Sequence, residues 1–349
     1  MAKKRITLPV DFRELIDKGD LNELKAVFAK CELNAYERNY IKRPALSFYG
    51  IPLELMRWLI EQGADIEAAD SYGKTPLFYH AQVNSTERVM FLLEQGADVH
   101  AKDRYGNTPL HFAEHHVETA EILLKAGADP LEQDESGLNV LERMLMRARG
   151  IYIKDAAKAA ELYLNAGCKK TEKAKEYVTR IGEDFEFHRS GFNPDYVEEA
   201  DKGLQKLYEL FGVRPVPKRI IHDGKTPIYL SGKTLQQQFE YAWDLLVPSS
   251  GKAATIQGEA VRVAGRIRDE LFRNGGCNWD KDFRKMLNAF PKYVSQGNPL
   301  DAALLAEIEE IKKDILDDDD LADRLAELAT LWVTQNPEPI KLETTDYKR

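Results

Sequence analysis

Three of the seven histidines of the chain lie within the stretch His111–His116, and their spacing is one that can bind a metal ion. His111, Glu114 and His115 follow the order His-x-x-Glu-His, in which a zinc protease places two imidazole ligands one helical turn apart beside a carboxylate. A catalytic zinc site also needs a third protein ligand, and no downstream glutamate is identifiable as that ligand in this sequence. Whether these residues bind metal or support the fold therefore depends on the elements that carry them.

The composition is that of a globular protein with an ample core. The chain has 349 residues, of which 43% are hydrophobic and 31% charged, and this length suffices for two domains. It has no apolar run of about 18 residues, and its basic N-terminus lacks the apolar region of a secretory signal. Cys31, Cys168 and Cys277 are too scattered for a disulfide framework or a metal clip. We expect a cytoplasmic protein without membrane contact.

Acidic residues outnumber basic ones, and the excess is uneven along the chain. The formal net charge is −9, which argues against direct binding of nucleic acid. Residues 1–175 hold 25 Lys and Arg against 27 Asp and Glu, whereas residues 176–349 hold 24 against 31. Residues 301–327 hold 11 acidic and 3 basic side chains. The second half is therefore the more acidic part of the chain.

The first half repeats itself. The sequence "SYGKTPLFYHA" at 71–81 returns as "RYGNTPLHFAE" at 104–114, which is 33 residues later. The sequence "LIEQGADIEAAD" at 59–70 returns as "LLEQGADVHAKD" at 92–103, again offset by 33, and as "LLKAGADPLEQD" at 123–134, offset by 31. A fixed period of this length indicates a stack of similar structural units.

These residues closely resemble the ankyrin repeat, in the Asp-x-x-Gly-x-Thr-Pro-Leu-His turn, the helix ending in Leu-Leu-x-x-Gly-Ala-Asp and the 33-residue period. The match is clearest over 43–134 and fades outward. Residues 12–34 resemble a divergent N-terminal capping pair, and residues 136–150 a repeat whose Thr-Pro-Leu-His has changed. The resemblance implies about five units within residues 1–175.

Local signals agree with such a solenoid. Thr75 and Thr108 each precede a proline, which suits a helix start with Thr as N-cap and Pro at the first helical position. Gly63, Gly96 and Gly127 each follow a leucine-rich helix, where a left-handed residue ends a helix. One helix pair is too small to bury its own apolar face, so neighbouring pairs must bury it jointly.

The resemblance favours a structural role for His111, which occupies the last position of Thr-Pro-Leu-His and would connect adjacent repeats by hydrogen bonds. His115 and His116 fall at the end of the inner helix, where ankyrin-repeat proteins vary and bind. For these two residues, partner contact and plain solvated surface both remain open.

The same resemblance implies where a partner would bind, namely at the turn tips and on the inner-helix face. The expected turn tips are Ser71, Tyr72, Lys74, Arg104, Tyr105, Asn107, Glu135 and Ser136. The expected inner-helix positions are Tyr79, Gln82, Phe112, His115 and His116. Tyr and Arg are enriched at interface hot spots, although Tyr72 and Tyr105 could simply pack along the row of turns.

Beyond residue 175 the repeat disappears and amphipathic helical patterns follow. We expect helices over 197–213, 233–247, 256–274 and, as a pair, within 299–333. The stretch 216–231 is typical of a small β-hairpin with Asp223-Gly224 as its turn. Residues 246–287 are similar to a segment of uncharacterised small bacterial proteins, a resemblance that implies no activity.

We find no catalytic constellation in this second half. Glu259 and Arg262 fall on the polar face of the helix expected over 256–274, opposite an apolar face that includes Ile256 and Leu271. Neither a carboxylate pair nor a nucleophile with its base is visible, so salt-linked helix faces are the favoured interpretation. The three Gly-Lys-Thr tripeptides lack the preceding glycine that a phosphate-binding loop requires.

Four consecutive aspartates, Asp317–Asp320, join the last two expected helices. Asp319 or Asp320 can cap the second of these helices, because a carboxylate is favourable at a helix N-terminus. The run is either a solvated turn or an acidic contact surface for a basic partner.

The sequence thus predicts an all-α protein, with an ankyrin-repeat solenoid over 1–175 and a helical domain over 176–349. We expect it to bind another protein without catalysis, metal or cofactor. Ankyrin repeats recur in bacterial immunity proteins, and an acidic half suits a cationic toxin, so an immunity or antitoxin role is the narrower hypothesis. A scaffold or regulatory adaptor, including a host-directed effector, is the alternative, and an enzyme with its site in 176–349 is the least favoured.

Overall fold

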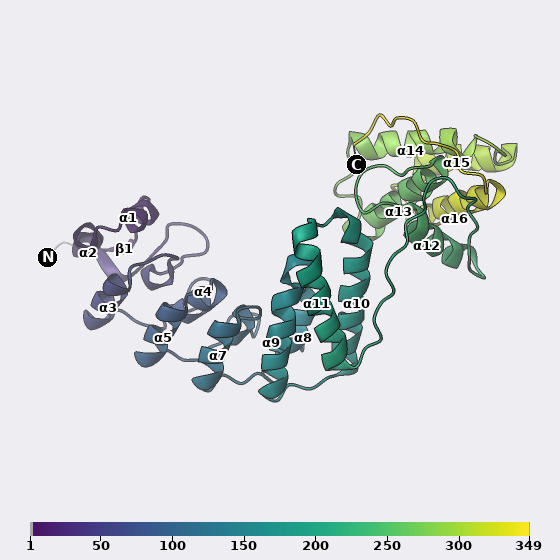
Figure 1. Cartoon of the computed structure of the whole chain (residues 1–349). Helices are drawn as coiled ribbons and strands as arrows, with labels where there is room; N and C mark the ends of the chain where they lie inside the picture. The colour runs from purple at the N-terminus through teal and green to yellow at the C-terminus, as the bar shows by residue number, and fades with distance from the viewer. Residues whose placement is uncertain (1–2, 349) are drawn as a thin grey trace. The chain divides into compact units, whose positions relative to one another are not determined.

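The computed structural model describes residues 3–348, without the side chains of Ser190, Pro194 and Asp195. It is mostly helical, with 56% helix and 3% strand, which confirms the all-α prediction. The chain divides into two compact units (Figure 1). The first comprises Met1–Phe185 with Asn193–Val216, and the second comprises Glu186–Phe192 with Pro217–Arg349.

Helix pairs follow one another through the described part of the first unit, as the repeat period predicts. The successive pairs are α1 (Phe12–Lys18) with α2 (Leu21–Lys30), η1 (Ala45–Ser47) with α3 (Leu53–Glu61), α4 (Pro76–Gln82) with α5 (Thr86–Glu94), α6 (Pro109–Phe112) with α7 (Val117–Lys125), and α8 (Val140–Arg147) with α9 (Ile153–Asn165). A short 3₁₀ turn, η2 (Gly150–Tyr152), precedes α9. In Figure 1, α3, α5 and α7 follow one another as one row of the stack.

The helix boundaries lie where the sequence places them. Thr75 and Thr108 are the N-cap residues of α4 and α6, each with proline directly after it. At the other helix ends, Gly63, Gly96 and Gly127 have φ values of +93°, +91° and +100°, a conformation that a side chain disfavours. The predicted helix starts and ends are therefore confirmed in position, although the Thr75 side chain makes no capping hydrogen bond.

The small sheet is not where the hairpin was expected. Strands β1 (Arg5–Thr7) and β2 (Cys31–Tyr36) pair in parallel in the first unit. The segment 216–231, which the structure describes throughout, forms no strand, so the hairpin prediction was wrong. Its backbone is bonded elsewhere: the N–H of His222 donates to the carbonyl of Leu245, and that of Ile228 to the carbonyl of Pro337.

Two further helices extend the first unit past the division expected at residue 175. Helix α10 (Glu172–His188) follows the last repeat, and α11 (Pro194–Phe211) packs on α9. The close approach depends on Gly203, because a Cβ there would lie 2.7 Å from the Cα of Lys154. A fading repeat signal does not reveal such a contact, because α11 lies outside the repeat pattern.

Replacing Gly203 with alanine is expected to lower the free energy of unfolding by about 1–3 kcal/mol, because the added methyl meets backbone that cannot move aside. Equilibrium urea denaturation of the full chain measures this change. Gln205→Ala is the control, since Gln205 is exposed on the same helix and should change stability by less than about 0.5 kcal/mol. An alanine at 203 that stabilises the protein would contradict the proposed packing.

The second unit is built around α13 (Ile256–Asn274), which contacts α12 (Leu235–Leu246), α14 (Lys281–Val294) and α16 (Asp320–Gln335). Helix α15 (Ala302–Asp314) packs against α14 and α16. Residues 256–265 are all buried, including Glu259 and Arg262. The salt link expected between Glu259 and Arg262 is present at 2.6 Å, and neighbouring elements bury it together with the apolar face.

The C-terminal segment 336–348 covers the start of α13. The amide nitrogen of Gln257 donates to the carbonyls of Asn336 and Glu338, and its oxygen accepts from the N–H of Ile340. The N–H of Ile256 donates to the carbonyl of Ile340 at 2.7 Å. This irregular segment therefore completes the core that the helices leave open.

Candidate functional site

The three clearest turns of the repeat are held by equivalent aspartates, Asp70, Asp103 and Asp134. In each turn one carboxylate oxygen accepts hydrogen bonds from the backbone N–H groups two and four residues later, at 2.7–3.1 Å. All three aspartates are buried. The turns are thereby fixed before any partner arrives, and their acidic groups face inward.

Neighbouring turn tips are linked into a row. The N–H of Arg104 donates to the carbonyl of Tyr72 at 2.8 Å, and that of Glu135 donates to the carbonyl of Tyr105 at 2.9 Å. The rings of Tyr72 and Tyr105 stack, with centroids 6.5 Å apart and planes at 24°. Arg104 and Tyr105 are exposed, while Tyr72 is half-buried. The tyrosines thus pack along the row and still present a surface to solvent.

His111 connects two repeats through both ring nitrogens. Its Nδ1 accepts from the N–H of Thr108 at 3.2 Å, and its Nε2 lies 3.3 Å from the carbonyl oxygen of Leu138 in the next turn. A carbonyl only accepts, so Nε2 donates. Burial lowers the pKa of His111, against the raising effect of the Leu138 carbonyl. The structural role predicted for His111 is confirmed by these bonds.

A cation–aromatic cluster lies at the inner helices. The Nζ of Lys74 is 4.2 Å from the ring centroid of Phe112, and the guanidinium of Arg143 is 5.9 Å from it. Arg143 also binds the carboxylate of Asp134 at 3.1 Å and the amide oxygen of Asn107. Burial lowers the pKa of Lys74. The cluster presents partly exposed cations above buried acids.

Glu114 extends this cluster toward the end of the inner helices. Its buried carboxylate lies 3.4 Å from Nε of Arg143, 3.3 Å from Nε of Arg147 and 3.7 Å from Nε2 of His115. Burial raises the pKa of Glu114, and the two arginines act in the opposite direction. The carboxylate thus contacts both guanidinium groups, of which Arg147 is half-exposed and Arg143 is mostly buried.

The two histidines that follow are engaged within the chain. The ring of His115 stacks on Tyr152, with centroids 5.8 Å apart, and burial together with Arg147 lowers the pKa of His115 to about 4. The Nε2 of His116 donates to the carbonyl of Gln82 at 3.1 Å. Both histidines are half-buried. Because the pKa of His115 is lowered, its imidazole is neutral at pH 7 and acts there as a flat polar ring.

The predicted binding residues thus divide by exposure. Tyr79 and Asn107 are buried: the Tyr79 hydroxyl donates to Asp70 at 2.6 Å, and the Asn107 amide donates to Asp103 at 3.0 Å. The predicted residues that keep exposed or half-exposed side chains are Ser71, Tyr72, Lys74, Gln82, Arg104, Tyr105, Phe112, Glu135, Ser136, His115 and His116.

Two surface residues of this region were missed, Arg147 and Tyr152. The third copy of the repeat, offset by 31 residues, aligns Arg143 with Phe112 and Arg147 with His116. Continuing the register through the altered repeat would have found both arginines. No pattern indicates Tyr152, which stands in the short turn before α9.

Asp317–Asp320 are all exposed at the junction of α15 and α16. Asp319 takes the N-cap position of α16, one of the two positions predicted, but its side chain makes no capping hydrogen bond. Instead, Oδ1 of Asp318 accepts from the N–H of Asp320 at 3.1 Å. The run forms an acidic turn on the surface.

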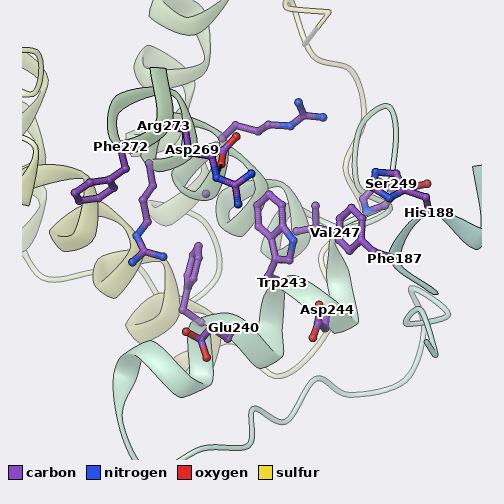
Figure 2. A pocket seen from close by; sticks show the side chains of 15 residues that line it. Phe187, His188, Glu240, Trp243, Asp244, Val247, Ser249, Asp269, Phe272 and Arg273 are labelled. Carbon is purple, nitrogen blue, oxygen red and sulfur yellow. Dashed lines mark ion pairs between the residues drawn. The ribbon is translucent and has the colours of Figure 1, made fainter. Parts of the chain in front are cut away.

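A separate cavity of about 830 Å³ lies in the second unit, beside α12 and α13 (Figure 2). Trp243 and Phe187 are parallel within 8°, with centroids 6.2 Å apart, and line the cavity together with Phe239 and Phe272. Phe187 comes from the short segment Glu186–Phe192. No motif in the sequence indicates this cavity.

Within residues 3–348, no three His, Cys, Asp or Glu side chains are grouped so as to hold a metal ion. Over the same residues, no helix is both long and apolar enough to cross a membrane.

Comparison with known families identifies the repeated segment. Residues 45–134 match the family described as ankyrin repeats, in three copies. The chain therefore contains ankyrin repeats over these residues, and a further helical segment follows them. The repeats imply a protein-binding module. A search of curated proteins finds no match to the chain.

Proposed function

We propose that this protein acts by binding another protein, without catalysis, through the turn tips and the inner-helix cluster of its repeats. The observation that carries the proposal is the cation–aromatic surface formed by Lys74, Phe112, Arg147 and Tyr152. Arg147 and Tyr152 are 52% and 55% exposed, whereas the carboxylate that organises the arginines is buried. Exposed arginine and tyrosine beside half-buried aromatic rings are the side chains that dominate protein interfaces.

Affinity purification of the full chain from its native cell, with mass spectrometry of the co-eluting proteins, tests this proposal. The double variant Arg147→Glu with Tyr152→Ala should lower the affinity for the recovered partner by about 30-fold or more. This is the effect of losing a hot spot of about 2 kcal/mol. The matched control is Lys125→Glu, which reverses a charge that is 77% exposed on the outer helix α7. Equal recovery with both variants would contradict the assignment of the face.

An immunity or antitoxin role is the more specific function that we propose, with a cationic toxin meeting the acidic surface of the second unit rather than the cationic face of the repeats. The exposed turn Asp317–Asp320 and the acidic excess of residues 176–349 favour a cationic partner, because a complementary field speeds encounter. Rapid capture is what a toxin inhibitor requires. A scaffold or adaptor has no such requirement for a strongly basic partner.

Co-expression with the product of the neighbouring gene tests the immunity role. Rescue of growth, and a complex whose association slows at high salt and in a variant with Asp317–Asp320 changed to asparagine, is the expected result. If growth is not rescued and no complex forms, the immunity role fails while the binding proposal stands.

A further inference from the structure

The cavity of the second unit has the size of a small-molecule site and a prearranged floor. Its volume of about 830 Å³ lies within the usual range of about 300–1,000 Å³. In Figure 2 the rings of Trp243 and Phe187 lie next to each other, and they form a parallel aromatic pair that lines the cavity. Such a pair suits a planar ring system that stacks on it.

Two further residues hold this floor in place. A Cβ at Gly265 would lie 2.2 Å from Cζ3 of Trp243, so the absence of a side chain there lets the indole rest directly on α13. The guanidinium of Arg219 stacks 4.1 Å from the Phe187 ring and donates to the carbonyls of Trp243 and Val247 at 3.0 and 2.6 Å. The aromatic surface is therefore rigid before a ligand enters.

The two helices that flank the floor carry opposite charges. Helix α12 contributes Glu240 and Asp244, one helical turn apart, whereas α13 contributes Arg266, Arg268 and Arg273 together with Asp269. Two of these arginines are ion-paired, Arg273 with Asp269 and Arg268 with Asp323 of α16. In Figure 2 the carboxylates of Glu240 and Asp244 lie on the other side of the indole from Asp269. The cavity is therefore acidic at one edge and basic at the other.

This arrangement discriminates between ligand classes. A cationic side chain stacked on the floor would meet three arginines, and a simple anion would meet the carboxylates of α12. A ligand with N–H donors on a planar ring at one end and a negative charge at the other end complements both edges. Ionised carboxylates only accept hydrogen bonds, and arginine is the side chain suited to phosphate.

We propose that this cavity binds a guanine nucleotide. The base stacks on Trp243 and Phe187, its N1–H and N2–H groups donate to the carboxylates of α12, and the phosphate binds the arginines of α13. Guanine is favoured over adenine because it presents two adjacent donor positions on one edge. The site is independent of the protein-binding face proposed for the repeats.

Isothermal titration of the full-length protein with guanosine monophosphate tests the proposal. Saturable binding is expected, and it should be at least tenfold weaker with adenosine monophosphate and with unphosphorylated guanosine. Trp243→Leu should weaken binding by about 10- to 100-fold, the range for loss of one stacked base. Arg273→Ala should weaken the binding of guanosine monophosphate about tenfold and leave the affinity for guanosine unchanged.

Two of the variants guard against misinterpretation. Arg273 is 80% exposed, so Arg273→Ala should fold normally even if Trp243→Leu does not. Arg284→Ala, an exposed cation on α14 outside the cavity, is the matched control and should bind as the unmodified protein does. No saturation up to millimolar nucleotide, or affinity unchanged in Arg273→Ala, would overturn the proposal.

Discussion

Replacing Arg262 with alanine is expected to lower the free energy of unfolding of the second unit by about 3–5 kcal/mol, because it leaves a buried carboxylate without its cation. The side chains of Arg262 and Glu259 are 1% and 0% exposed. Their contacts measure 2.6 Å from Nη2 to Oε1 and 3.0 Å from Nε to Oε2. Urea denaturation followed by tryptophan fluorescence, to which the fully buried Trp332 contributes, measures the loss.

Two comparisons separate this effect from a general loss of charge. Arg273→Ala removes an exposed ion pair with Asp269 on the same helix and should cost less than about 1 kcal/mol. The double variant Glu259→Leu with Arg262→Met should recover part of the stability, since a buried pair can be replaced by apolar residues of similar volume. The N–H of Ala253 and the hydroxyl of Tyr347 then lose their acceptor, which limits the recovery. A loss below about 1 kcal/mol for Arg262→Ala would show that water reaches the Glu259 carboxylate.

Lowering the pH from 7 to 4 is expected to remove about 3 kcal/mol of stability from the repeats through His80 alone. Burial lowers the pKa of His80 from 6.5 to about 4, with Arg88 acting in the same direction and the Leu46 carbonyl against it. The unfolded chain therefore binds more protons between these two values. The contribution of His80 to the free energy of unfolding is therefore fully present above about pH 6.5, and it is lost as the pH drops toward 4.

The slope of stability against pH is the measurement that tests this prediction. His80→Gln should lower stability at pH 7, because the ring and its hydrogen bond to Leu46 are lost, yet it should flatten the decline toward pH 4. His115, whose pKa is also about 4, adds a decline of the same sign, whereas the raised pKa of Glu114 acts in the opposite direction. An unchanged slope in His80→Gln would contradict the assignment.

The repeats could be predicted from sequence because their contacts are local and recur. Thr75-Pro76 and Thr108-Pro109 fix helix starts, and the last histidine of the motif, His111, bonds to the next turn. The exposure of the predicted binding residues was anticipated only in part. Tyr79 and Asn107 occupy surface positions of the repeat pattern, yet hydrogen bonds to Asp70 and Asp103 hold them inside.

The second unit was less predictable because its arrangement depends on distant segments. A helical pattern identifies one apolar face of α13. It does not show that Tyr347 covers Glu259, where the tyrosine hydroxyl donates to Oε1 of Glu259 at 2.7 Å. The cavity likewise needs Phe187, which is far in sequence from Trp243. Periodicity carries no information on contacts of this kind, so neither could be predicted.

The interleaved division of the chain has a consequence for recombination and for limited proteolysis. The polypeptide passes between the two units at 185, again at 192 and again at 216. No single cut yields both units whole: cleavage before 186 leaves α11 with the wrong fragment, and cleavage after 216 removes Phe187 from the aromatic floor. A one-point crossover can therefore exchange the repeats but not the whole first unit, because α11 lies beyond the segment Glu186–Phe192.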